Sequence, residues 1–173
     1  AAVWVNGQFV GYAEDSYLPS EWKITDKVRK GKNNVSVRVY RFTSGSFLEC
    51  QDYWRLTGIT RDVYLWSAPK TRISDFFFRT TALKADNSEA EAVLSVNIAG
   101  AKPRKATLEA QLMDGERLLA QQTAAVTSTG DLELRFPSVK GITAWSAEQP
   151  RLYDLRLTLT EKGKPTDRSE EHT

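Results

Sequence analysis

Apolar residues occupy every second position in short runs throughout this sequence. A period of two places alternate side chains on opposite faces of a β-strand, so each run has one buried and one solvated face, as in antiparallel sheets. Residues 111–126 contain enough Ala and Leu for a helix, but Asp114-Gly115 interrupts them and favours a hairpin from Leu108 into Leu118. The pattern therefore predicts an all-β protein. The clearest runs are Val35, Val37 and Val39; Ala92, Leu94, Val96 and Ile98; Leu132, Leu134 and Phe136; and Tyr153, Leu155, Leu157 and Leu159.

Turn-forming residues separate these runs. Asn6-Gly7 lies between Val5 and Phe9 and is the strongest short hairpin signal, because both residues tolerate a positive φ. Further turns are expected at residues 30–34, 86–88, 114–115 and 161–165, which are rich in Gly, Asn, Asp and Pro.

A change in composition near Ala68-Pro69 indicates two domains. Residues 1–68 contain 12 of the 18 aromatic residues, whereas residues 69–173 show short strands at regular spacing, typical of an immunoglobulin-like β-sandwich. The first domain offers only four or five strands, so we expect part of a sandwich. Phe76-Phe77-Phe78 breaks the alternation and predicts a strand buried on both faces or packed at the domain interface, with an exposed patch as the alternative.

Composition excludes several classes of function. The net charge is +2, which gives no electrostatic case for nucleic-acid binding, and no apolar run approaches the length of a membrane span. Cys50 is the only cysteine, so no intrachain disulfide can form, and either the cytoplasm or the periplasm is compatible. His172 is the only histidine, which argues against a Ser-His-Asp triad, a Cys-His pair or a His-rich zinc site.

Several motifs resemble the β-galactosidases of glycoside hydrolase family 2. The most specific is Gln51-Asp52-x-Trp54-Arg55 within residues 47–63. Residues 3–22 resemble the family's sugar-binding jelly roll, and residues 145–153 resemble the end of the immunoglobulin-like domain that follows it. The resemblance implies residues 1–68 as the C-terminal part of the jelly-roll domain and residues 69–173 as the immunoglobulin-like domain.

The resemblance also implies a retaining glycosidase in which a TIM barrel, absent from this sequence, carries two catalytic glutamates. This chain would then be a non-catalytic fragment, inactive alone, that supplies a substrate-orienting loop and a structural spacer. The β-glucuronidases and β-mannosidases share the architecture. The implied partners are a galactoside and the barrel, with no nucleic acid or membrane, and the parent protein would be a homo-oligomer that uses sodium and magnesium.

Asp52 is the main candidate site residue. By resemblance it contacts galactose and ligates a monovalent cation in the full enzyme, and a carboxylate suits both ligands. The alternative is a loop aspartate bonded to backbone N–H groups. Trp54 and Arg55 are weaker substrate-binding candidates, for which we favour roles in packing and at the domain interface. Cys50 departs from the family, where an acidic residue is common, and this weakens the cation assignment.

A different class of function stays open: a stand-alone carbohydrate-binding or adhesive β-sandwich. Such a module would present its aromatic residues on an open face and bind sugar without a barrel, whereas a fragment would expose sheet edges and apolar surface.

Overall fold

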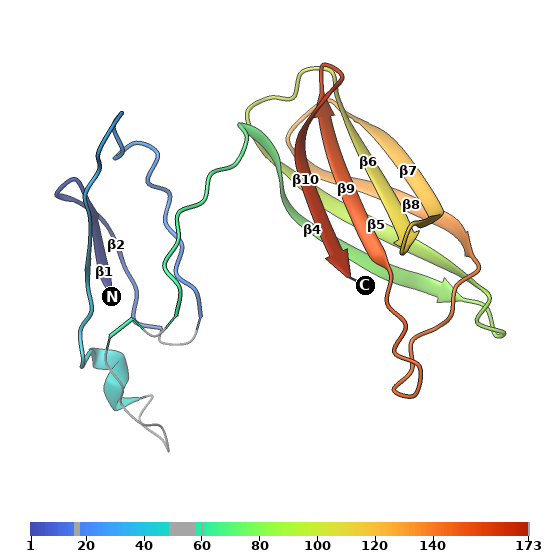
Figure 1. Ribbon diagram of the computed structural model, residues 1–173, viewed down its shortest axis with the longest axis horizontal. Coiled ribbons are helices and arrows are strands. Elements are labelled where there is room, and N and C mark those ends of the chain that lie inside the picture. Colours follow the sequence, from blue (N-terminus) through green and yellow to red (C-terminus); the bar gives the residue numbers. More distant parts are fainter. Residues whose placement is uncertain (16–17, 49–57, 60, 173) are drawn as a thin grey trace. The chain divides into compact units, whose positions relative to one another are not determined.

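The computed structural model describes residues 1–15, 18–48, 58–59 and 61–172 (Figure 1). The chain divides into two compact units, Ala1–Leu65 and Trp66–Thr173, each of which is described by itself. In the described residues the regular elements are strands and one short 3-10 helix, which confirms the all-β prediction. No helix in this part of the chain is long and apolar enough to cross a bilayer.

The first unit contains one antiparallel sheet in its described part. Its strands are β1 (Ala2–Val5), β2 (Gln8–Tyr12) and β3 (Val35–Arg38), in the order β2-β1-β3. The 3-10 helix η1 (Ser44–Phe47) follows β3. Central strand β1 is the buried one, with Val5 fully covered, because it has a neighbour on each side.

The Asn6-Gly7 turn joins β1 to β2, as the sequence predicts. Both residues have positive φ, 51° and 80°, which is the conformation that a tight two-residue hairpin requires. Asn6 also binds the segment before β3, donating from Nδ2 to Asn33 Oδ1 at 2.8 Å and to the Lys27 carbonyl at 2.9 Å. The turn therefore anchors the long connection between β2 and β3.

The second unit is a two-layer β-sandwich (Figure 1). One sheet has the order β10-β9-β6-β7 and the other has the order β4-β5-β8, and all pairings are antiparallel. These two sheets agree with the predicted immunoglobulin-like architecture. The strands are β4 (Thr71–Leu83), β5 (Glu89–Gly100), β6 (Ala106–Asp114), β7 (Arg117–Val126), β8 (Gly130–Lys140), β9 (Asp154–Glu161) and β10 (Lys164–His172).

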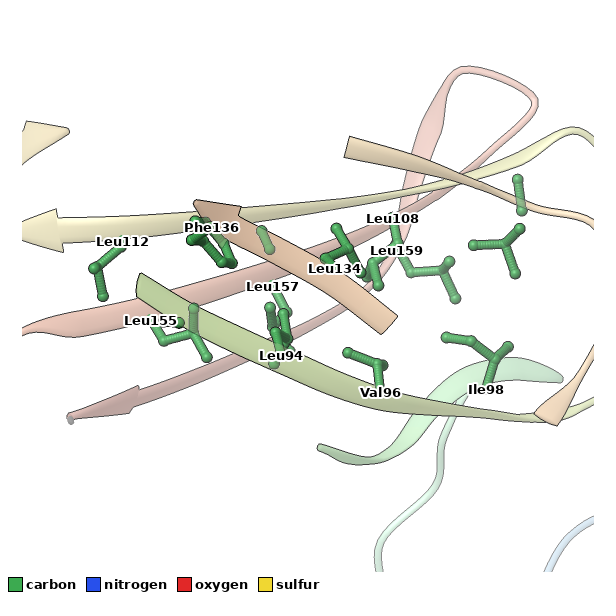
Figure 2. Close-up of a cluster of buried hydrophobic side chains, with 14 of the residues drawn as sticks. Leu94, Val96, Ile98, Leu108, Leu112, Leu134, Phe136, Leu155, Leu157 and Leu159 are labelled. Atoms are coloured by element: carbon green, nitrogen blue, oxygen red, sulfur yellow. The ribbon is translucent and has the colours of Figure 1, made fainter. Parts of the chain in front are cut away.

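The hydrophobic core of the second unit lies between its two sheets (Figure 2). It is built from the alternating residues that the sequence singles out, because the inward side chains of each strand meet those of the opposite layer. The helix-like stretch after Leu108 forms the β6–β7 hairpin, as expected, with Gly115 at φ 60° in the turn. Leu94, Ile98, Leu108, Phe136, Leu155, Leu157 and Leu159 are the largest leucine, isoleucine and phenylalanine side chains buried in this core.

The three consecutive phenylalanines of β4 do not lie in a strand buried on both faces. Phe76 and Phe78 pack against the core, whereas the Phe77 side chain is 62% exposed. A β-bulge between Ile73 and Asp75 shifts the register of β4 against β5, after which the ordinary alternation resumes. The prediction of burial on both faces was therefore wrong, because ordinary alternation holds through these residues.

Candidate functional site

The three site residues predicted from the sequence, Asp52, Trp54 and Arg55, lie outside the described residues, as does Cys50. Phe47, the last residue of η1, and Leu48 are the last described residues before these positions in the chain. The candidate site is therefore described through the residues around η1.

Glu14 is the centre of this arrangement. Its carboxylate accepts a hydrogen bond from the Tyr12 hydroxyl at 2.8 Å, from the Ser44 hydroxyl at 3.1 and 3.2 Å, and from the Gly45 backbone N–H at 3.0 Å. Tyr12 ends β2, and Ser44 and Gly45 begin η1. One carboxylate thus joins two segments that are about thirty residues apart in the sequence.

The electrostatics of this cluster follow from its hydrogen bonds. The Tyr12 hydroxyl, and then the Gly45 N–H, hold the pKa of Glu14 below its ordinary value, because they stabilise the ionised carboxylate. The same hydrogen bond to Glu14 raises the pKa of Tyr12, since the phenol keeps its proton to donate. At neutral pH the cluster is therefore a carboxylate surrounded by donors.

Aromatic side chains gather on one face of the first unit's sheet. Trp4 contacts Phe9 edge to face, with ring centroids 5.7 Å apart, and the Arg38 guanidinium lies 5.6 Å from the Trp4 centroid. Tyr12 and Tyr40 form a second edge-to-face pair at 6.2 Å. This face offers aromatic rings of a kind that can stack on sugar C–H surfaces.

A shallow depression of about 400 Å³ lies at one end of the second unit. Its polar groups already bind one another: Arg151 pairs with Asp114 and lies 5.9 Å from the Tyr153 ring centroid, and the Thr143 N–H donates to the Tyr153 hydroxyl at 2.7 Å. These contacts tie the β8–β9 connection to the end of β6, which is a structural role. The depression is lined by Asp114, Gly141, Thr143, Gln149, Pro150, Arg151 and Tyr153.

The described residues contain no cluster of three or more His, Cys, Asp or Glu side chains that could hold a metal ion. Sequence reasoning missed the Glu14 cluster. The sequence contains Tyr12-x-Glu14, but no sequence pattern predicts that Ser44 binds Glu14. The contact depends on the path of the chain after β3.

Two family models cover almost the whole chain. The sugar binding domain of glycosyl hydrolases family 2 matches residues 1–69, and a second model of glycosyl hydrolases family 2 matches residues 71–173. Among curated proteins, the β-galactosidase of Clostridium acetobutylicum is 39% identical over 160 residues, covering 92% of this chain and 17% of the relative. The β-galactosidase of Streptococcus thermophilus is 41% identical over 161 residues, covering 90% and 15%.

Solved structures have the same fold. A glycosyl hydrolase family 2 member from Bacteroides cellulosilyticus matches 99% of this chain and 24% of its own, with a TM-score of 0.80 and 24% identity. Bacteroides uniformis β-glucuronidase 2 matches 99% of this chain and 22% of its own, with a TM-score of 0.83 and 20% identity. The chain spans only 15 to 17% of the length of the curated relatives that it matches.

Proposed function

This chain belongs to glycosyl hydrolase family 2, and on that premise we propose that it serves a retaining β-galactosidase. It supplies a substrate-orienting segment from residues 1–68 and a structural spacer from residues 69–173, and residues outside the chain perform the hydrolysis. The observation that carries the proposal is the 39 to 41% identity with curated β-galactosidases over at least 90% of the chain.

The division of labour follows from the chemistry of glycoside hydrolysis. A retaining enzyme needs two carboxyl groups about 5 to 5.5 Å apart, one as nucleophile and one as acid and base. In the family these are barrel glutamates, and the sequence resembles neither barrel motif. A TIM barrel beyond this chain therefore supplies both groups, and this chain contributes binding and orientation.

Asp52 is the residue that we propose to touch the substrate. An ionised carboxylate accepts up to about four hydrogen bonds, so it can hold adjacent sugar hydroxyls in one orientation. Charge-assisted hydrogen bonds of this kind contribute about 1.5 to 3 kcal/mol each. Trp54 offers a ring for stacking and Arg55 a planar guanidinium, and both flank Asp52 in the motif.

The residues proposed from this chain account for only part of the proposed cation binding. A carboxylate oxygen is a suitable ligand for sodium, so Asp52 would provide one ligand of a sodium site that the longer protein completes. We propose that the longer protein also uses magnesium. We also propose that the longer protein is a homo-oligomer, which light scattering of the purified protein would test.

The test uses the full-length protein and an Asp52→Asn variant. We expect the parent to hydrolyse nitrophenyl β-galactoside in preference to the β-glucuronide and β-mannoside, with retention of configuration. The substitution keeps the shape of the side chain but removes its charge, so kcat/KM should fall about 10- to 100-fold with an unchanged melting temperature. Equal kcat/KM values for the two proteins would remove Asp52 from substrate binding.

A second measurement separates the fragment from a stand-alone sugar-binding module. The ¹⁵N-labelled chain is titrated with galactose in sodium and then in potassium buffer while amide shifts are followed by NMR. We expect no saturable shift of residues 51–55 at tens of millimolar galactose, because the site is incomplete without the barrel. Saturable shifts would instead support an autonomous carbohydrate-binding function.

A further inference from the structure

The outer face of the sheet β4-β5-β8 carries charges of opposite sign at its two ends. Leu94, Val96 and Ile98 of β5 point into the core (Figure 2), so the residues between them point away from it. The register of the sheet places the outward residues in rows that cross the three strands. The rows, in the strand order β4, β5, β8, are Asp75–Asn97–Asp131, Phe77–Ser95–Glu133 and Arg79–Val93–Arg135.

The first row is the acidic end of this face. Asp75 and Asp131 are exposed, and Asn97 between them donates from Nδ2 to Asp131 Oδ1 at 2.6 Å. The Ser74 hydroxyl donates to Asn97 Oδ1 at 2.5 Å, which holds the amide from the other side. Neither aspartate forms an ion pair with another residue in the described part of the chain.

The third row is the basic end, four residues or about 13 Å further along each strand. Arg79 and Arg135 are exposed and flank Val93 in the register. Val93 is only 5% exposed although it lies outside the core between the sheets. The aliphatic parts of the two arginines account for this cover, because long charged side chains lie along apolar surface. Arg135 also pairs with Glu133 at 2.5 Å, whereas Arg79 has no ion-pair partner among the described residues.

Phe77 lies in the middle row, between the two charged ends. Its side chain is 62% exposed, and Ser95 is its neighbour on β5. An aromatic side chain at the centre of a polar patch is the kind of residue that contributes most to protein–protein contacts.

Two face-to-face arrangements with two-fold symmetry keep the strands of two copies aligned, and the charges distinguish them. When the axis runs across the strands over the middle row, the strands are antiparallel. Arg79 of one copy then faces Asp75 of the other, Arg135 faces Asp131, and the two Phe77 rings meet at the axis. When the axis runs along the strands, Asp75 faces Asp131 and Arg79 faces Arg135, which places like charges together. The face is therefore complementary to itself in the antiparallel arrangement.

We propose that the outer face of β4-β5-β8 is a self-association surface, on which a second copy of this chain docks with antiparallel strands. Charge complementarity selects a second copy as the occupant, because an isologous contact repeats each Arg–Asp pair by symmetry. Glu133 faces its counterpart near the axis, where its ion pair with Arg135 offsets the repulsion. Three strands offer less than the roughly 800 Å² per partner of a standard interface, so we expect a weak dimer. This inference does not depend on the proposed glycosidase function.

Sedimentation equilibrium of the 173-residue chain over a series of concentrations tests the proposal. The parent chain should dimerise, and more weakly at high salt because the charge pairs are screened. Asp75→Arg and Arg79→Asp each place like charges across the axis, so each variant alone should dimerise about 10-fold more weakly or worse. An equimolar mixture of the two variants restores opposite charges at every one of these contacts. We therefore expect a heterodimer that is tighter than either variant alone.

Further variants keep the test decisive. Phe77→Ser should weaken the dimer, because it removes the aromatic contact at the axis. Asp131→Arg and Arg135→Asp form a second charge-swap pair on β8, for use if a β4 variant has a lowered melting temperature. Glu116→Arg, in the turn between β6 and β7, makes the same charge change away from this face, so we expect parental dimerisation.

Three results would overturn the proposal. The first is a parent chain that stays monomeric at every concentration, and the second is a dimer that Asp75→Arg and Arg79→Asp weaken no more than Glu116→Arg does. The third is a mixture of the two β4 variants that associates no more tightly than each variant by itself. The second or third result would place the dimer contact on another surface. None of these results bears on the proposed role of Asp52.

Discussion

Leu94→Ala tests whether the contact between the two sheets stabilises the second unit. Leu94 lies on β5, the middle strand of its sheet, and its side chain is 0% exposed. The substitution removes three carbon atoms, a transfer loss of about 2.4 kcal/mol at roughly 0.8 kcal/mol for each buried CH₂. Phe78 and Leu134 flank it on the neighbouring strands and limit collapse, so the cavity adds about 1 kcal/mol. The expected loss in the free energy of unfolding is about 3 to 4 kcal/mol.

The assay is urea unfolding followed by amide NMR signals of β5 and β9, which report on the second unit alone. Leu118→Ala on β7 is the matched control, because it makes the same chemical change where the side chain is 47% exposed. The control should lose less than about 1 kcal/mol. A Leu94→Ala loss within about 0.5 kcal/mol of the control would refute the argument that this core holds the sandwich together.

Two further predictions concern the second unit. Gly100→Ala should cost at least about 2 kcal/mol in unfolding free energy, because φ is 103° and the new Cβ would overlap the Lys70 carbonyl oxygen. Gly115→Ala is the control and should cost about 1 kcal/mol, because φ is 60° but no atom lies within 4 Å of the new Cβ. Hydrogen bonds from Lys84 and, to a smaller extent, from Ser138 hold the pKa of Glu89 below its ordinary value of 4.5. The ionised carboxylate therefore stabilises the fold above pH 4.5, and this contribution is lost as the pH falls through the lowered pKa. The stability difference between the parent and Glu89→Gln should therefore be constant near neutral pH and shrink below about pH 4.5 in urea titrations, and a difference that grows on acidification would contradict the assignment.

Alternation predicted the second unit well because both of its layers are present. Leu94, Val96 and Ile98 on β5 alternate in the sequence, and each is buried against the opposite sheet. For the phenylalanines of β4, burial on both faces was predicted from residue type alone, and Phe77 is exposed instead. Burial depends on register as well as hydrophobicity, and Phe77 lies opposite Ser95 on the outer face.

The candidate site was less accessible to sequence reasoning for a different reason. Asp52 was proposed from a motif, and it remains a prediction because it lies outside the described residues. The Glu14 contacts join residues about thirty positions apart through polar atoms, and a single sequence has no periodic signal for such a pairing. Helix and strand periodicities report local geometry, whereas this cluster depends on the path of the chain from β3 into η1.

The valines of β3 show that alternation in the sequence does not by itself predict burial. Val35 and Val37 alternate as cleanly as the residues of β5, yet their side chains are 45% and 38% exposed, and the next valine of the run, Val39, is 39% exposed. Alternation assigns side chains to a face, but burial requires a second layer over that face. The described residues of the first unit form a single sheet in which β1 is central and β3 is an edge strand. Val5 of β1 is fully buried although Val35, its partner on the same face of β3, is 45% exposed, so the position of a strand within the sheet decides burial there as well.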